Sequence, residues 1–401
     1  RLCDLMGRRR LLLAGIALFT AASVLCGLAP TLGWLLAARA LQGAGAAVMM
    51  ALTMAFVGET VPKARTGSAM GLLGTMSAMG TALGPSLGGL LVAGPGWRAL
   101  FLVNVPLGVA AFGLAQRCLP EDRPQEGRRS GFDPLGTGLL PMTLAAYALA
   151  VTTGRGHFGA LNLALLAAAA LGAGLFVLAE SRVASPLVRL TMFRQPALSA
   201  SLVISALVST VMMATLVVGP FYLSRALGLH AAVVGLALSA GPLAAALAAM
   251  PAGRMADRFG AQRMTIAGLV AMAAGALVLS LLPASLGVGG YVAPLVVMTV
   301  GYSLFQTANN TAVMSDIAAD QRGVVSGLLN LSRNLGLITG ASVMGAVFAW
   351  ASHAVDVTAA PPEAVAAGMR VTFAVAAALI ACSLAIAAAS RELAARRAVL
   401  L

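Results

Sequence analysis

The residues with the clearest chemistry lie in two short charged segments. Residues 253–263 read Gly-Arg-Met-Ala-Asp-Arg-Phe-Gly-Ala-Gln-Arg between two long apolar runs, and residues 1–10 open the chain with a related pattern. Each segment places one acid, Asp257 or Asp4, among arginines. A carboxylate in this setting can bind the positive N-terminus of a helix or a neighbouring guanidinium group. Two copies of the segment indicate an internal repeat.

Arg39 and Arg333 lie inside apolar runs rather than between them. A charged side chain at that depth costs roughly 2.5–3.5 kcal/mol on insertion scales, so each arginine is expected to face a polar partner or a wet cavity.

Groups that could hold a metal ion or build an enzymatic centre are sparse. The three histidines and four cysteines are scattered, with no spacing typical of a metal site. The thirteen acids all lie in expected loops or near the ends of apolar runs, and the chain has no ATP-binding motif. We therefore expect no enzyme, no metal and no cofactor.

The apolar runs that must position these residues dominate the chain. Of its 401 residues, 60% are hydrophobic and 10% are charged, and the mean hydropathy is +0.93. A soluble domain carries roughly 25% charged residues, so lipid is the expected solvent for most of this chain. Backbone groups in lipid must bond internally, which predicts an all-α bundle. Twelve spans are expected, at residues 11–29, 34–57, 67–93, 99–117, 134–153, 160–180, 197–222, 231–252, 264–283, 290–314, 324–350 and 370–390.

Positive charge predicts the orientation of these spans. The net charge is +13, and if residues 1–10 are cytoplasmic, twenty Lys and Arg residues fall in cytoplasmic loops and four in outer loops. Cytoplasmic loops of membrane proteins carry such an excess. Topology thus explains the basic balance without a nucleic-acid partner, and the C-terminus is expected in the cytoplasm.

Two polar stretches, at residues 120–130 and 181–196, read as cytoplasmic linkers. They predict three parts: residues 1–117 with four spans, residues 118–196 with the linkers and two spans, and residues 197–401 with six spans.

The segment at 253–263 resembles the G-x-L-x-D-R-x-G-R loop of the major facilitator superfamily, with Met255 at the leucine position and Gln262 where a basic residue is common. The copy at 1–10 departs further, with Leu5 at the usual arginine position. In the family, the acid of this loop docks on a neighbouring helix N-terminus and an arginine, and holds one alternating-access state. The resemblance implies gating roles for Asp4, Gly7, Arg8, Gly253, Asp257, Arg258 and Gly260.

Two further segments resemble motifs of the same family. Residues 39–47 look like its R-x-x-Q-G-x-G-A-A motif, which implies that Arg39 and Gln42 take part in proton coupling. Residues 80–89 look like its G-x-x-x-G-P-x-x-G-G motif, which marks antiporters. The spacing of these glycines also predicts a helix face in close contact with a neighbour. The residues of this antiporter motif are Gly80, Gly84, Pro85, Gly88 and Gly89.

The number of expected spans indicates which branch of the family the chain resembles. Eight expected spans separate the two charged segments, whereas six separate them in a 12-span member. The added pair, at 134–153 and 160–180, resembles the 14-span drug:proton antiporter branch, as do residues 97–108 and 132–136. The implied major facilitator fold has two six-helix halves plus two central helices. Twelve of fourteen spans are then visible, and two helices are expected before residue 1.

The resemblance implies a secondary transporter that exports amphipathic or cationic drugs or antibiotics in exchange for protons. We expect a monomer in the lipid bilayer of a bacterial plasma membrane, with the proton gradient as its energy source. The main proton-carrying acid is expected in the absent first helix, with Glu59 or Asp316 as the alternative. Cavity-lining helices of the family suggest substrate contacts at Met213, Tyr302, Phe305, Gln306, Asn309 and Asn310.

Two other functions fit the sequence less closely. A dedicated exporter of one endogenous metabolite would share the same fold. A non-transporting membrane sensor or scaffold is disfavoured by the antiporter motif and by the lack of any expected soluble domain.

Overall fold

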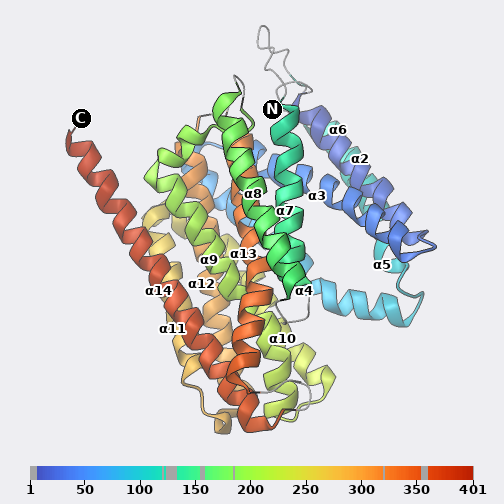
Figure 1. The fold of residues 1–401 in the computed structure, drawn as a ribbon, viewed down its shortest axis with the longest axis vertical. Coiled ribbons are helices and arrows are strands. Elements are labelled where there is room, and N and C mark those ends of the chain that lie inside the picture. Colours follow the sequence, from blue (N-terminus) through green and yellow to red (C-terminus); the bar gives the residue numbers. More distant parts are fainter. Residues whose placement is uncertain are drawn as a thin grey trace. The chain divides into compact units, whose positions relative to one another are not determined.

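All regular secondary structure in the part of the chain that the structure describes is helical (Figure 1). A computed structural model describes residues 7–119, 122, 133–153, 159–183, 186–318, 321–353 and 360–400. None of these residues lies in a β-strand. The all-α prediction is therefore confirmed.

Long helices correspond to each of the twelve predicted spans. They are α2 (Arg8–Gly27), α3 (Leu32–Thr60), α4 (Thr66–Ala93), α5 (Ala99–Leu102) continuing as α6 (Asn104–Cys118), α7 (Pro134–Thr152), α8 (Ala160–Arg182), α9 (Pro196–Phe221), α10 (Ala231–Phe259), α11 (Ala261–Ser280), α12 (Gly287–Asp316), α13 (Arg322–Ala351) and α14 (Pro362–Leu400). Short helical turns complete the chain: η1 (Lys63–Arg65), η2 (Leu190–Arg194), η3 (Tyr222–Ala226) and η4 (Ala284–Leu286).

Eleven helices in the described part of the chain are long and apolar enough to cross a membrane, with α5 and α6 counted together. Helix α4 is not among the eleven, and several of its side chains lie outside the described set. Many large apolar side chains are exposed, such as Leu247 at 78% and Leu236 at 74%. In water such exposure is costly, whereas lipid solvates these side chains.

Two helix ends differ from the prediction. Helix α10 runs through Phe259, so most of the charged segment at 253–263 is helical and not a loop. The turn itself is Gly260, whose φ of 89° favours glycine. Helix α14 covers Pro362–Leu400, well beyond the predicted span at 370–390. Apolar runs mark the lipid-level part of a helix, and backbone hydrogen bonding continues past it into polar sequence.

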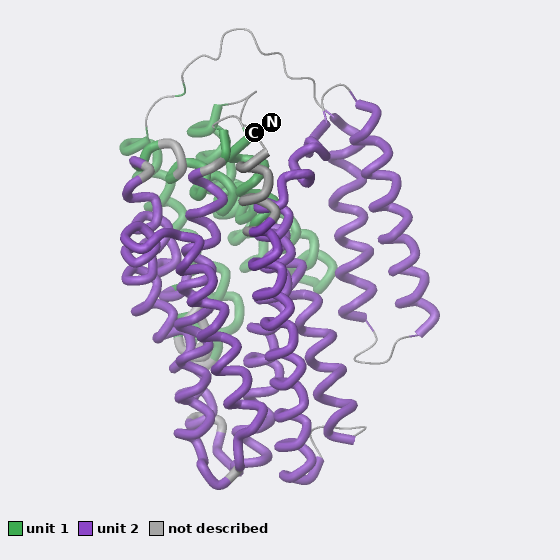
Figure 2. The backbone as a smooth tube through the Cα atoms, turned by 90° about the vertical axis from the view of Figure 1, so that its left-hand side faces the viewer, with its two compact units in different colours: residues 1–61, 80–132, 317–330 green, residues 62–79, 133–316, 331–401 purple. Residues whose placement is uncertain are grey.

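The chain divides into two compact units, coloured separately in Figure 2. Unit 1 comprises residues 1–61, 80–132 and 317–330, and unit 2 comprises residues 62–79, 133–316 and 331–401.

Unit 1 is built on the crossing of α2 and α3. An ideal Cβ at Gly45 of α3 would lie 2.7 Å from the backbone nitrogen of Phe19 and 2.9 Å from the carbonyl oxygen of Gly15. Only glycine permits this approach. Leu12, Ile16 and Leu52 form the small buried cluster beside the crossing.

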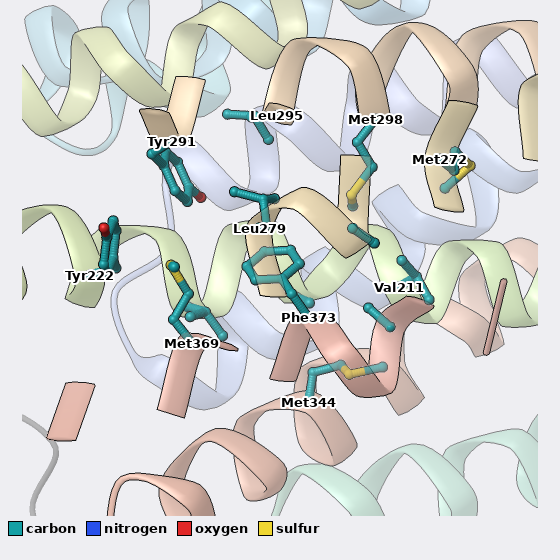
Figure 3. Close-up of a cluster of buried hydrophobic side chains, with 14 of the residues drawn as sticks. Val211, Tyr222, Met272, Leu279, Tyr291, Leu295, Met298, Met344, Met369 and Phe373 are labelled. Carbon is teal, nitrogen blue, oxygen red and sulfur yellow. The ribbon is translucent and has the colours of Figure 1, made fainter. Parts of the chain in front are cut away.

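Unit 2 contains the larger core, shown in Figure 3. It is formed by side chains from α9, η3, α10, α11, α12, α13 and α14, many of them methionines and aromatics. Helices α11 and α12 cross closely, because an ideal Cβ at Gly268 would lie 2.5 Å from the backbone nitrogen of Phe305. Helix α13 approaches α9 in the same way, with Gly336 against the carbonyl oxygen of Ala206.

Candidate functional site

The carboxylate of Asp257 binds the first turn of α4 within unit 2. Its Oδ1 accepts the backbone N–H of Gly67 at 2.7 Å, and its Oδ2 accepts the backbone N–H and the hydroxyl of Ser68 at 2.8 and 2.7 Å. The first N–H groups of a helix have no partner within the helix and carry its positive dipole end. A carboxylate at this position therefore stabilises the helix end and fixes α10 to α4.

Glycines on both helices make this contact possible. An ideal Cβ at Gly253 would lie 2.2 Å from the carbonyl oxygen of Gly67, and one at Gly71 would lie 2.5 Å from the carbonyl oxygen of Ala249. Side chains at these positions would separate the backbones and withdraw Asp257 from α4. Gly253 thus has a packing role one helical turn before the acid that it positions.

The remaining residues of the charged segment lie at the end of α10. Arg258 is exposed, and its guanidinium carbon lies 5.3 Å from the ring centroid of Phe259. Gly260 ends α10 and starts α11. No hydrogen bond joins Arg258 to Asp257 in this part of the chain.

Arg39 and Gln42 form a polar network inside unit 1. Arg39 Nη1 donates to Gln42 Oε1 at 2.6 Å, and Gln42 Nε2 donates to the hydroxyl of Ser23 at 2.7 Å. Gln42 and Ser23 are buried, and the guanidinium carbon of Arg39 lies 5.8 Å from the ring centroid of Phe101. The network gives the intramembrane arginine the polar partner that its depth requires.

The first charged segment is seen only in part. Asp4 lies outside the described residues, whereas Gly7 caps α2 with a φ of 83° and Arg8 opens the helix. The α2 N-terminus is bound by Asp122, which accepts the backbone N–H groups of Arg9 at 2.9 Å and Arg10 at 3.1 Å. The sequence had placed Asp122 in a featureless linker. No local sequence pattern indicates that Asp122 caps a helix whose first residues lie 113 positions away in the chain.

Comparison with known proteins shows the family of this chain. A family model described as Major Facilitator Superfamily matches residues 1–341 and 200–398. The chain belongs to the major facilitator superfamily. This is a family of membrane transporters and not of enzymes.

Several curated proteins of the superfamily are similar to this chain. Multidrug resistance protein Stp of Mycobacterium tuberculosis is 32% identical over 367 residues, which are 88% of this chain and 66% of Stp. Multidrug efflux pump LfrA of Mycolicibacterium smegmatis is 31% identical and covers 86% of this chain and 68% of LfrA. The tetracenomycin C resistance and export protein of Streptomyces glaucescens is 31% identical, with 87% and 65% covered. The chain thus spans about two thirds of the length of these relatives.

A solved structure shares the fold. The human organic anion transporter MFSD10 superposes with a TM-score of 0.68, covering 96% of this chain and 78% of its own, at 16% sequence identity. The major facilitator fold that the motifs implied is therefore confirmed, together with a multi-pass membrane protein.

The segment at residues 80–89, which resembles the antiporter motif, lies on α4. Nothing lies within 4 Å of an ideal Cβ at Gly80, and at Gly88 the nearest atom is a side-chain carbon of Leu100 at 3.6 Å. The close helix contact expected from the glycine spacing is therefore not present at these two positions. The environments of Gly84, Pro85 and Gly89 lie outside the described part of the chain. On this helix the close contact is made by Gly67 and Gly71 instead.

The residues suggested for substrate contact fall into two groups within unit 2. Phe305 and Asn309 are buried at 2% and 3% exposure, so a substrate cannot reach them in this conformation. Both groups include an aromatic residue and a side-chain amide on α12, so the sequence alone did not show which of these residues are buried. The half-buried members are Met213, Tyr302, Gln306 and Asn310.

The two extra helices, α7 and α8, pack against each other (Figure 1), and α7 contacts α13. The hydroxyl of Tyr147 lies 2.5 Å from that of Thr339, and Ser342 donates to the carbonyl oxygen of Val151. Two acids at the ends of these helices, Asp133 and Glu180, are buried, although every acid was expected in a loop or near a span end. Their position at the end of an apolar run gave no indication of burial.

Proposed function

We propose that this protein is a proton-driven exporter of amphipathic or cationic drugs or antibiotics. The observation that carries the proposal is the similarity, at 31–32% identity over most of the chain, to proteins named for multidrug resistance and multidrug efflux. The polar network of Arg39 and Gln42 supports proton coupling, because an arginine within a membrane-spanning helix is costly to insert and is typical of functional sites.

The Asp257 contact supports alternating access as the transport mechanism. A carboxylate held by a helix N-terminus gives one conformation of the transporter a specific lock, which must open when the transporter changes state. Gly253 and Gly260 shape the segment that presents Asp257, and Asp4, Gly7, Arg8 and Arg258 belong to the same proposed gating set. Half-buried residues of α9 and α12 are the proposed substrate contacts.

The proposal includes fourteen spans, a cytoplasmic C-terminus and a monomeric transporter in a bacterial plasma membrane. The pair α7 and α8 supports the fourteen-span arrangement, since it is inserted between the two linkers. Protons are the proposed coupling ion. The side chains of Glu59 and Asp316 lie outside the described residues, so the proposal assigns the main proton site to neither.

Efflux from cells tests this function directly. Cells that express the full-length gene should accumulate less of a fluorescent cationic dye than cells with an empty vector, and a protonophore should abolish the difference. A matched strain carrying Asp257→Asn should lose efflux, whereas Glu363→Gln, an exposed acid in the first turn of α14, should retain it. Efflux that persists with the protonophore would contradict proton coupling.

A dedicated exporter is the second candidate. Relatives at 27–31% identity include the riboflavin transporter RibZ of Clostridioides difficile and the tetracenomycin C export protein. Efflux of one compound from a broad chemical panel, with no effect on the others, would favour this function over multidrug export.

A further inference from the structure

Two buried acids meet where α7 begins and the chain leaves α8. Asp133 is the N-cap of α7, and its Oδ1 accepts the backbone N–H of Gly136 at 3.0 Å. Glu180 lies in the last turns of α8, and its Oε2 accepts the backbone N–H of Val188 at 3.2 Å. The two side chains are exposed by only 2% and 3%.

The second oxygen of each acid has no hydrogen-bond partner among the described residues. These atoms are Asp133 Oδ2 and Glu180 Oε1. Both point to the same place, because an ideal Cβ at Gly136 would lie 2.3 Å from the first and 2.4 Å from the second. The two oxygens are therefore at most about 4.7 Å apart, the sum of these distances.

Two ionised carboxylates at this separation, both withdrawn from water, would repel each other strongly. Among the described residues, no ion pair with a cation offsets the repulsion. Arg182, Arg189 and Arg194 on the adjoining chain are exposed, and no ion pair joins them to either acid in the described part.

A bound proton satisfies this arrangement better than a metal ion. One proton between the two oxygens forms a short charge-assisted O–H···O hydrogen bond and removes one negative charge. Calcium and magnesium require about six oxygen ligands, whereas this site offers two free carboxyl oxygens. No cluster of three or more potential metal ligands occurs among the described residues.

We propose that Asp133 and Glu180 together bind one exchangeable proton, between Asp133 Oδ2 and Glu180 Oε1. This titratable site links the start of α7 to the end of α8 and, through Glu180, to Val188. Gly136 makes room for the pair, since any side chain there would occupy the space between the acids. The site does not depend on the proposed transport activity.

Labelling with an apolar carbodiimide tests for the proton. This reagent adds to a protonated carboxyl group: the carboxyl oxygen bonds to the carbodiimide carbon, the proton moves to nitrogen, and the adduct rearranges to a stable N-acylurea. The full-length protein in liposomes is labelled at neutral pH, and its peptides are quantified by mass spectrometry. We expect at least about tenfold more label on the Asp133 or Glu180 peptide than on the exposed Glu363 peptide. Equal labelling of the three acids would overturn the proposal.

Matched glycine variants separate the site from general stability. Gly136→Ala should abolish labelling of the pair, whereas Gly138→Ala, two residues along the same helix with nothing within 4 Å of its ideal Cβ, should leave it unchanged. Excess sodium or magnesium should not protect the acids. Protection by either ion would mean that the two acids bind a metal ion and not a proton, which would overturn the inference.

A second measurement applies even if Gly136→Ala fails to fold. The folded pair keeps a proton that the unfolded chain releases, so the thermal stability of the parent should fall as the pH rises above the ordinary range of carboxyl pKa values. The variant Asp133→Asn, Glu180→Gln has no titrating group here and should lose this slope. An unchanged slope in that variant would refute the proton site.

Discussion

Replacing Asp257 with asparagine should open the contact between α10 and α4. The substitution keeps the size of the side chain and one acceptor oxygen. It removes the negative charge and turns an NH₂ group toward a backbone N–H of Gly67 or Ser68, both of which now donate to the carboxylate. Two donors then face each other where a donor and an acceptor met.

The size of the effect follows from the three hydrogen bonds at this helix end. Bonds to a charged acceptor are worth about 1.5–3 kcal/mol each, but water replaces much of that at a half-buried helix terminus. Removal of a helix cap costs about 0.5–2 kcal/mol, and loss of the charge at the dipole adds up to about 1 kcal/mol. We expect a loss of about 2 kcal/mol, which is about a 30-fold shift toward the open state.

A cysteine reporter measures this shift. Thr66, the first residue of α4, is buried at 3% exposure and close in size to cysteine. In a background whose native cysteines are replaced, the rate at which a water-soluble maleimide modifies Thr66→Cys reports the open fraction. Asp257→Asn should raise that rate about 30-fold, and Ser68→Ala, which removes one hydroxyl donor, by about fivefold.

Glu363→Gln is the matched control, because it removes an exposed acid from the first turn of another helix. It should leave the labelling rate unchanged. The reasoning is refuted if Asp257→Asn labels at the parent rate, since the cap would then contribute nothing to the closed state. It is refuted equally if Glu363→Gln matches Asp257→Asn, because the effect would then come from net charge.

Three further predictions concern packing and buried polar groups, each measured as a thermal unfolding midpoint in detergent. Gly253→Ala should destabilise the protein by about 1–3 kcal/mol, since its Cβ would meet a backbone oxygen of α4. Gly235→Ala, in open space on the same helix, should be neutral or stabilising. Equal losses of stability in the two variants would contradict the close crossing. Gln42→Leu leaves the guanidinium of Arg39 without its acceptor and should cost about 1–3 kcal/mol, with a parallel loss of dye efflux. Tyr147→Phe removes one hydroxyl contact to α13 and should cost no more than about 1 kcal/mol, so a larger loss would mean that this contact fixes the extra helix pair.

The sequence by itself determined the helices, their approximate positions and the family. Each membrane span is a run of about 20 apolar residues, which is a local property. The motif at 253–263 likewise requires only neighbouring residues to be recognised. Even the hydrogen bond from Arg39 to Gln42 follows from their spacing of three along one helix, which places both on the same face.

Only the tertiary structure decided what the acids bind. Asp257 meets Gly67 and Ser68 across about 190 residues of chain, and Asp133 meets Glu180 across the whole of α7 and α8. Whether a carboxyl group at a helix end is solvated or buried depends on which distant segment covers it, and no local pattern records that. The same holds for glycines: Gly253 and Gly235 both lie on α10, yet one lies against a backbone and the other against open space.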